Sequence, residues 1–243
     1  MTEPSSSGII VTGASSGIGA ATARALAERN YVIGCLSRRG TIPKAANGQL
    51  HGYECDVTDQ QQVRETVQAF GAQVERIVGL VNCAGIHEET PSLQLSLDSL
   101  RKLLEVNFIS AFAVAQQVYP LMKDHGGLIV NIGSFYDHLG VRSNLAYAAS
   151  KAAVASMTRT LAIEWARDNI QLINVAPGYI LTDLNREWFS DSKNYEAVIR
   201  RIPARQLGQP EDVGRLITSL FESRSPFLTG TTIYMDGGQG ISL

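Results

Sequence analysis

Short apolar runs alternate with longer amphipathic segments along almost the whole chain. The apolar runs are continuous rather than interleaved with polar residues, which is typical of strands buried on both faces of a sheet. We expect strands at 9–11, 31–36, 52–55, 77–81, 128–132, 170–175 and 231–235. We expect helices at 17–30, 59–72, 97–124, 145–168 and 210–222. Strands that alternate with helices predict an α/β fold, a doubly wound domain with a central parallel sheet of about seven strands.

Three segments lack such a pattern. Residues 1–7 are Ser-rich and predict a flexible tail, 41–50 predict a loop or weak helix, and 178–206 predict an irregular, aromatic-bearing lid. Thr58 or Asp59 is the expected N-cap of the helix that follows. No linker or repeat divides the chain, so we interpret residues 1–243 as one domain. Its ligand crevice is expected at the carboxyl ends of the strands.

Composition excludes several classes of protein. The 21 Lys and Arg against 23 Asp and Glu argue against a nucleic-acid partner bound through a basic surface. No apolar run approaches the ~18 residues of a membrane-spanning helix. The three cysteines have no metal-binding spacing and form no even disulfide set, which suits a reducing cytoplasm. The first residues also lack the pattern of a signal peptide, so we expect a cytoplasmic protein.

A glycine-rich loop joins the first strand to the first helix, at residues 12–19. Gly13 permits a tight turn, Gly17 lets the backbone approach a diphosphate, and Gly19 lets the helix pack closely on the strand. The free N–H groups of the helix N-terminus would then face the phosphates. The alternative is a purely structural turn. The strand–loop–helix context favours a dinucleotide site of the Rossmann type.

The spacing G-x-x-x-G-x-G resembles the short-chain dehydrogenase/reductase family, and the resemblance continues to the C-terminus. The N-x-A-G element of the family matches Asn82 to Gly85, and its catalytic Tyr-x-x-x-Lys matches Tyr147 and Lys151. The other matches are Asn107, Ser134, Pro177-Gly178, Thr182, Thr229-Gly230 and Asp236-Gly237-Gly238. Cys83 is a departure, because many members have Asn there, and it should matter little if that stretch acts through its backbone.

Tyr147 and Lys151 are four residues apart on one expected helix and therefore share a face. A nearby ammonium favours the phenolate, so we expect Lys151 to lower the pKa of Tyr147 from about 10. Tyr147 could then act as general acid or base at a substrate oxygen. Ser134 is expected to hold that oxygen. By resemblance, Lys151 also binds the nicotinamide ribose and Asn107 seats a water for proton relay.

Each of these residues has a simpler interpretation. Tyr147 could be an ordinary aromatic at a helix start and Lys151 a solvated charge. Asn107 could merely satisfy buried backbone groups. The intact set favours catalysis over a dinucleotide-binding sensor that catalyses nothing.

The end of the second strand bears on the choice of cofactor. Ser37 stands where an NAD enzyme would have a carboxylate, and Arg38 and Arg39 follow it. Guanidinium groups bind phosphate in bidentate geometry, which predicts NADP(H). Asp56 is expected by resemblance to meet the adenine, or else to cap a helix. Asn82 is expected to fix the loop under the cofactor. The complete expected cofactor set is Gly13, Ser15, Ser16, Gly17, Ile18, Gly19, Ser37, Arg38, Arg39, Asp56, Val57, Asn82, Ala84, Gly85, Tyr147, Lys151, Pro177, Gly178, Ile180 and Thr182.

Aromatic residues gather in the segments expected on the substrate side. The expected substrate contacts are Phe135, Tyr136, His138, Tyr179 and Trp188. They favour an apolar or ring-bearing ketone, although half of them could simply pack the lid. His87 and His138 could line the pocket, but a lone histidine is more often structural.

The sequence thus predicts an NADP(H)-dependent oxidoreductase that interconverts a carbonyl compound and a secondary alcohol. The alternatives are a 3-oxoacyl-carrier-protein reductase, for which the stretches at 123–127 and 166–169 are only weakly basic, and a polyol or sugar dehydrogenase. By resemblance, the long helices at 97–124 and 145–168 make subunit contacts in a homodimer or homotetramer.

Overall fold

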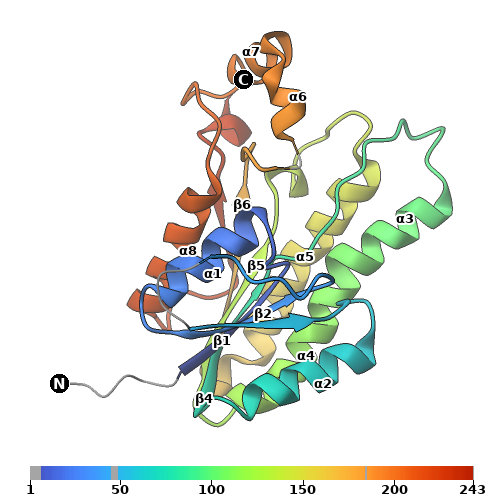
Figure 1. The fold of residues 1–243 in the computed structure, drawn as a ribbon. Helices are drawn as coiled ribbons and strands as arrows, with labels where there is room; N and C mark the ends of the chain where they lie inside the picture. The colour runs from blue at the N-terminus through green and yellow to red at the C-terminus, as the bar shows by residue number, and fades with distance from the viewer. Residues whose placement is uncertain (1–6, 45–48, 184, 243) are drawn as a thin grey trace.

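The computed structural model describes residues 7–44, 49–183 and 185–242. Within these residues, one parallel sheet has its strands in the spatial order β3-β2-β1-β4-β5-β6-β7 (Figure 1). The strands are β1 (Ser7–Thr12), β2 (Val32–Ser37), β3 (Leu50–Glu54), β4 (Arg76–Asn82), β5 (Gly127–Ile132), β6 (Ile170–Pro177) and β7 (Thr231–Met235). The α-helices are α1 (Gly17–Ala27), α2 (Gln60–Gly71), α3 (Leu97–Leu104), α4 (Ser110–Met122), α5 (Leu145–Glu164), α6 (Arg186–Ser190), α7 (Ser192–Ile199) and α8 (Pro210–Ser223). The strand order reverses direction beside β1, as in a Rossmann fold.

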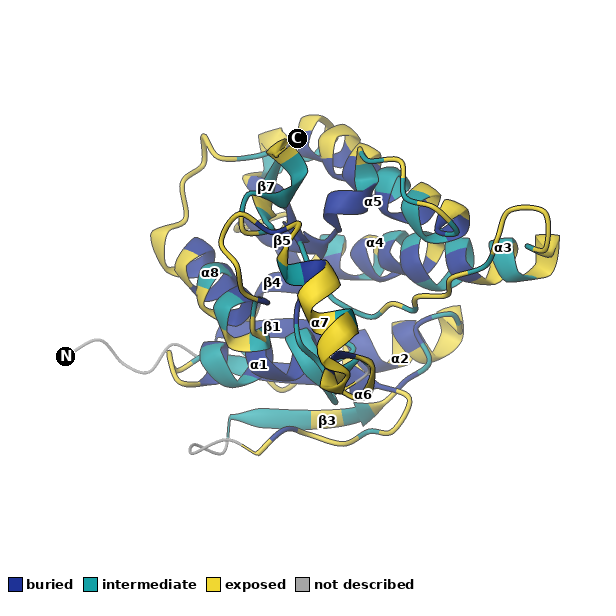
Figure 2. Ribbon diagram, turned by 90° about the horizontal axis from the view of Figure 1, so that it is seen from above, coloured by how far each residue is buried: buried dark blue, intermediate teal, exposed yellow. Residues whose placement is uncertain are grey.

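Helices cover both faces of the sheet (Figure 2). Leu26 of α1 and Ile217 of α8 pack with Val11 of β1 in one apolar core. Val67 of α2 and Val118 of α4 belong to a second core on the opposite face, which α5 also joins. The central strands β1, β5 and β6 are buried along their whole length, which explains their continuous apolar sequence.

Several expected boundaries move in the structure. Ser7, expected in the tail, is the first residue of β1 and pairs with Arg76, while residues 1–6 lie outside the described residues. The third strand begins at Leu50, within the expected loop, of which residues 45–48 also lie outside the described residues. Asp59, rather than Thr58, caps α2 by accepting hydrogen bonds from two backbone N–H groups.

For two segments, the expected type of secondary structure is wrong. The expected single helix at 97–124 is interrupted between α3 and α4 by a π-helical turn, Glu105–Ile109. The segment 178–206 is not irregular, because it contains α6 and α7. The second long helix ends at Glu164, and a 3₁₀ turn, Ala166–Asp168, follows it.

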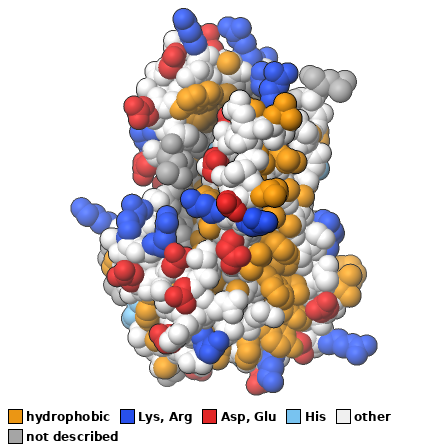
Figure 3. Space-filling view, turned by 90° about the vertical axis from the view of Figure 1, so that its right-hand side faces the viewer, with side chains coloured by type: hydrophobic (Ala, Val, Ile, Leu, Met, Phe, Trp, Pro, Cys, Tyr) orange, Lys and Arg blue, Asp and Glu red, His pale blue; other side chains and the backbone are white. Residues whose placement is uncertain are grey.

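Hydrophobic side chains form a band on the side of the molecule that carries α3, α4 and α5 (Figure 3). On α5, Leu145 and Ile163 are large apolar residues that are 55% and 80% exposed, and Ile109, just before α4, is 41% exposed. Among the described residues, no helix combines the length and apolar character needed to cross a membrane.

Candidate active site

The loop between β1 and α1 is shaped by its glycines. Gly13 has φ +67°, and a Cβ atom there would come within 2.9 Å of the Ala84 backbone. A Cβ atom on Gly19 would collide with the carbonyl oxygen of Gly13, so α1 packs directly on the end of β1. The nearest neighbour of a Cβ atom on Gly17 would be the Thr182 side chain, 3.5 Å away. Gly17 has φ +53°, a backbone conformation that residues with a side chain rarely adopt, and this turn fits the expected approach of a diphosphate.

The N-terminus of α1 has no side-chain cap. Ser16 occupies the N-cap position, but its hydroxyl caps none of the helix N–H groups. Arg39 Nη2 lies 2.9 Å from Ser15 Oγ and 3.5 Å from Ser16 Oγ, donating to both hydroxyls. The first turn of α1, with the partly buried Ile18, therefore retains backbone N–H groups for an anion and has a guanidinium beside it.

The ends of β2 and β3 bring a second guanidinium and a carboxylate together. Two hydrogen bonds from Thr58, through its N–H at 3.0 Å and its hydroxyl at 2.8 Å, lower the pKa of Asp56, and the charge of Arg38 lowers it further. Asp56 is therefore not the cap of α2. Ser37 is buried, and its Oγ has no hydrogen-bond partner among the described residues. Val57 lies in the apolar core.

The loop after β4 is fixed by the end of β1. Thr12 Oγ1 accepts hydrogen bonds from the backbone N–H groups of Cys83 and Ala84, at 3.0 and 3.1 Å. Because the backbone makes these contacts, the change to Cys at 83 leaves them intact. Asn82, which we expected to fix this loop, donates instead to Asn131 Oδ1 and to the Ala111 carbonyl. It ties β4 to β5 and α4.

Asn107 lies in the π-helical turn, and its side chain is occupied by protein groups. Its Oδ1 accepts from the Ile86 N–H at 2.8 Å, while its Nδ2 donates to the Ile86 carbonyl at 2.9 Å and to Ser150 Oγ at 3.0 Å. Gly85 lies against this amide: a Cβ atom there would be 3.2 Å from Asn107 Oδ1 and 3.7 Å from Lys151 Nζ. Asn107 therefore joins the loop after β4 to α5, close to the lysine.

The catalytic candidates Ser134, Tyr147 and Lys151 come together beside the end of β5. Lys151 is 5% exposed and donates a 2.8 Å hydrogen bond to the Ile132 carbonyl. Its Nζ lies 5.6 Å from the centre of the Tyr147 ring. Ser134 Oγ accepts from the Tyr136 N–H at 3.2 Å and is also within hydrogen-bonding reach of the Tyr147 hydroxyl. These three side chains lie close enough together to take part in one proton transfer.

The protonation of this group differs from expectation. Burial raises the pKa of Tyr147, a hydrogen bond with Ser134 lowers it in part, and the Cys83 thiol raises it. We expected Lys151 to lower the pKa of Tyr147, but Lys151 is not among the groups that shift it. The Lys151 ammonium lies over the Tyr147 ring, 5.6 Å from its centre. Burial lowers the pKa of Lys151 itself to about 8. Lys151 is therefore mostly charged at pH 7 and loses its proton just above it.

The turn after β6 brings the remaining expected cofactor residues to the same edge of the sheet. The Gly178 N–H donates to the Met235 carbonyl at 3.0 Å, directly after Pro177. Asn185 Oδ1 accepts from the Thr182 N–H at 2.8 Å, which holds Thr182 opposite Gly17. Ile180 is buried.

The expected substrate residues divide into two groups. Tyr136 and Tyr179 join their hydroxyl groups at 2.9 Å, and the Tyr136 ring lies 5.9 Å from that of Tyr147. Phe135 is buried behind them, 5.6 Å from the Tyr179 ring, and Trp188 is half exposed on α6. His138 lies apart from this group, because it contacts Asp137 at 2.8 Å and packs on Tyr234 of β7.

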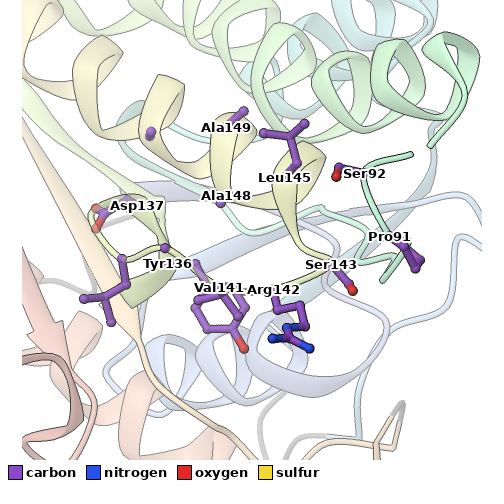
Figure 4. Close-up of a pocket in the computed structure, with 13 residues that line it drawn as sticks. Pro91, Ser92, Tyr136, Asp137, Val141, Arg142, Ser143, Leu145, Ala148 and Ala149 are labelled. Atoms are coloured by element: carbon purple, nitrogen blue, oxygen red, sulfur yellow. The ribbon is translucent and has the colours of Figure 1, made fainter. Parts of the chain in front are cut away.

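A cavity of about 800 Å³ opens beside this aromatic group (Figure 4). Tyr136 lines it, whereas Ser134 and Tyr147 do not. Leu139, Val141 and Leu145 give it an apolar wall, and Arg142 is the one basic residue that lines it within the described part of the chain. None of these four residues carries a pattern by which sequence reasoning could have found it.

The chain matches known proteins over almost its whole length. The profile of the family described as enoyl-(acyl carrier protein) reductase matches residues 13–239. Carbonyl reductase family member 4 of Xenopus tropicalis is 32% identical over 232 residues, which cover 94% of this chain and 95% of that protein. The 3-oxoacyl-acyl-carrier-protein reductase FabG of Thermotoga maritima is 35% identical over 237 residues, covering 94% of this chain and 96% of that one.

A solved structure agrees with these relatives. Ligand-free aldohexose dehydrogenase of Thermoplasma acidophilum superposes with a TM-score of 0.89 at 27% identity, covering 99% of this chain and 96% of that one. The chain is thus an oxidoreductase of the Rossmann type that uses a nicotinamide dinucleotide. It belongs to the short-chain dehydrogenase/reductase family.

Proposed function

We propose that the protein is an NADP(H)-dependent oxidoreductase that interconverts a carbonyl compound and a secondary alcohol, with Tyr147 as general acid and base. The observation that carries this proposal is the meeting of Ser134, Tyr147 and Lys151 beside the end of β5. When bound, the nicotinamide dinucleotide supplies or accepts the hydride. The positive φ of Gly17 and the uncapped first turn of α1 fit its diphosphate.

The chain's own residues handle the proton. In the reducing direction, Tyr147 Oη gives its proton to the carbonyl oxygen, and the Ser134 hydroxyl holds that oxygen by a hydrogen bond. The raised pKa of Tyr147 keeps the phenol in its protonated form at neutral pH. We assign Lys151, held by the Ile132 carbonyl, to binding the nicotinamide ribose, as the family resemblance implies, rather than to lowering the pKa of Tyr147.

The preference for NADP(H) rests on the residues after β2. Ser37 is short, and its hydroxyl has no partner among the described residues, while Arg39 reaches over the glycine loop to Ser15. The segment 37–39 carries two guanidinium groups and, unlike that of an NAD enzyme, no carboxylate, which favours a 2′-phosphate. Asp56 fits the adenine side, because two hydrogen bonds from Thr58 hold it at the neighbouring strand end.

The substrate class follows from the aromatic group. Tyr136 lines the apolar cavity and packs on Tyr147, and its hydroxyl bonds that of Tyr179. Trp188 packs on Phe189, whose ring contacts that of Tyr179, which supports the segment 178–206 as the substrate lid. These contacts favour an apolar or ring-bearing ketone. A 3-oxoacyl chain on a carrier protein is the second candidate, favoured by the name of the Thermotoga relative.

We also propose a cytoplasmic homo-oligomer, a dimer or tetramer. The exposed apolar band over α3, α4 and α5 supports subunit contacts (Figure 3), and the three cysteines are unpaired, as in a reducing compartment. Light scattering coupled to size-exclusion chromatography measures the subunit number, and a monomer at micromolar concentration contradicts this part.

The central test is NADPH oxidation, followed by absorbance, with a panel of aliphatic, aromatic and carrier-bound ketones and with sugars. Tyr147→Phe should lower kcat by a factor of about 100 or more while NADPH binding by calorimetry is retained. Near-wild-type turnover in that variant contradicts the role of Tyr147. Cofactor binding with no turnover on any substrate would favour a sensor over an enzyme.

A further inference from the structure

His87 lies in the loop between β4 and α3, at the edge of the candidate active site. Its ring packs edge-on against the Tyr147 ring, with centroids 4.7 Å apart and planes at 76°. The Tyr136 ring makes the other aromatic contact with Tyr147, at 5.9 Å and 85°. Such T-shaped contacts are the favoured geometry of aromatic pairs. Two rings from separate segments of the chain therefore restrict the orientation of the Tyr147 ring.

Asn144 holds the His87 ring in place. His87 Nε2 lies 2.7 Å from Asn144 Oδ1, and Asn144 Nδ2 donates to the Arg142 carbonyl at 2.9 Å. Because a carbonyl oxygen can only accept, the Asn144 amide nitrogen must face Arg142 and its oxygen must face His87. His87 Nε2 therefore carries the hydrogen of this bond.

Asn144 stands at a helix N-cap, but its side chain bonds another segment of the chain instead of the helix. Asn144 is the N-cap residue of α5, the helix that carries Tyr147 and Lys151, and asparagine is among the preferred capping residues. Its side chain nevertheless caps no N–H group of α5 and is buried, at 2% exposure, in the bond to His87. A second tether, from the Thr90 N–H to the Ser143 carbonyl at 2.8 Å, joins the same two segments.

The contact of His87 with Tyr147 does little for the apolar core, because His87 is exposed in the crevice. A structural histidine would be expected among core side chains. Here, a partly buried hydrogen bond from the buried Asn144 holds an exposed ring against one particular residue. The hydrogen bond between Asn144 and His87 thus restricts the orientation of the Tyr147 ring through the His87 ring.

We propose that His87, held by Asn144, is a positioning residue that fixes the orientation of the Tyr147 ring for proton transfer. Its effect on turnover rests on the proposed function of Tyr147 as the proton donor. The positioning itself does not, since it is a property of two rings and one hydrogen bond. The loss of orientation should lower kcat rather than weaken substrate or cofactor binding.

The kinetic test compares three substitutions. His87→Ala removes the ring and the hydrogen bond and should lower kcat about tenfold, with KM and the NADPH Kd within about twofold of wild type. His87→Phe keeps a ring beside Tyr147 and should recover part of kcat. His51→Ala is the matched control, because His51 is a partly exposed histidine that contacts Phe70, far from the crevice, and it should leave kcat unchanged. A kcat of His87→Ala within about twofold of wild type, or a loss seen only in KM, overturns the proposal.

A measurement without turnover separates this proposal from the proposed function. In protein with ¹³C-labelled tyrosine rings, the Tyr147 signal is assigned from Tyr147→Phe, and its ring-flip rate is measured by NMR. We expect the flip rate to rise severalfold in His87→Ala and in Asn144→Ala, and an unchanged rate in His87→Ala overturns the positioning role. If Asn144→Ala does not fold, His87→Ala decides the result alone. If the flip rate rises but no ketone is reduced by wild type, the proposed function fails and the positioning stands.

Discussion

Lys151 Nζ donates a 2.8 Å hydrogen bond to the carbonyl oxygen of Ile132, the last residue of β5. Ile132 lies two residues before Ser134 in the chain. The bond therefore holds the ammonium of a residue from α5 close to Ser134, which follows the end of β5. The lysine is 5% exposed, and its burial lowers the pKa to about 8. The hydrogen bond therefore holds the Lys151 ammonium in place, while its burial destabilises the charged form.

Replacing this lysine should change how stability depends on pH. In the folded protein the pKa of Lys151 is about 8, against 10.5 for an unperturbed lysine. Between these values the unfolded chain binds more protons, so the free energy of unfolding rises with pH. Wild type should gain about 2 kcal/mol between pH 7 and about 9.5 relative to Lys151→Met. Urea titrations of both proteins measure the difference, and parallel pH curves would contradict it.

Removing the hydroxyl of Ser134 should shift the pH profile of alcohol oxidation. The hydrogen bond from Ser134 lowers the pKa of Tyr147, and oxidation requires the phenolate as base. In Ser134→Ala the rising limb of the kcat profile should therefore move to higher pH, by roughly one unit. Ser134→Thr keeps a hydroxyl and serves as control. An unmoved profile in Ser134→Ala, with kcat lowered at every pH, would show that Ser134 acts on the substrate alone.

Neutralising the two arginines after β2 should abolish the proposed preference for NADP(H). Arg39→Ala removes the guanidinium that bonds Ser15, and Arg38→Ala removes the one that stabilises the charge of Asp56. Each should raise KM for NADPH by about 10- to 100-fold and leave NADH almost unaffected. Arg29→Ala, which breaks only a surface ion pair with Glu222, is the control. Equal losses with both cofactors, or tighter binding of NADH by wild type, would refute the preference for NADP(H).

Most of the fold could be predicted because its signals are local. Continuous apolar runs marked the central strands, and Asp59 and the glycines of the first loop lie where capping and turn preferences put them. The π-helical turn at Glu105–Ile109 has no such signal, since it contains neither Gly nor Pro. Its Asn107 bonds Ile86 and Ser150, which are 21 and 43 residues away, so the irregularity depends on tertiary contacts.

Sequence reasoning could name candidate site residues that the structure brings together, but it could not give their arrangement. Motif spacing found Ser134, Tyr147 and Lys151, whereas burial, which decides the pKa of both Tyr147 and Lys151, depends on the folded surroundings. His138 could not be separated from its aromatic neighbours by sequence, because its contact with Tyr234 joins residues almost a hundred positions apart. The same holds for α6 and α7, which are too short for a clear helical period.

Close packing of α8 on the sheet should make Gly79 intolerant of a side chain. Gly79 lies in the middle of β4, and a Cβ atom there would overlap the ring of Phe221, which is buried on α8. Gly79→Ala should therefore destabilise the protein by about 1–3 kcal/mol, because the added methyl group overpacks a core in which the Phe221 ring is buried. Gly140→Ala is the matched control, since a Cβ atom there meets nothing within 4 Å, and it should change stability by less than about 1 kcal/mol. Urea denaturation followed by circular dichroism compares the two variants with wild type. Equal stability of both variants would mean that α8 can shift away from β4 without loss of packing.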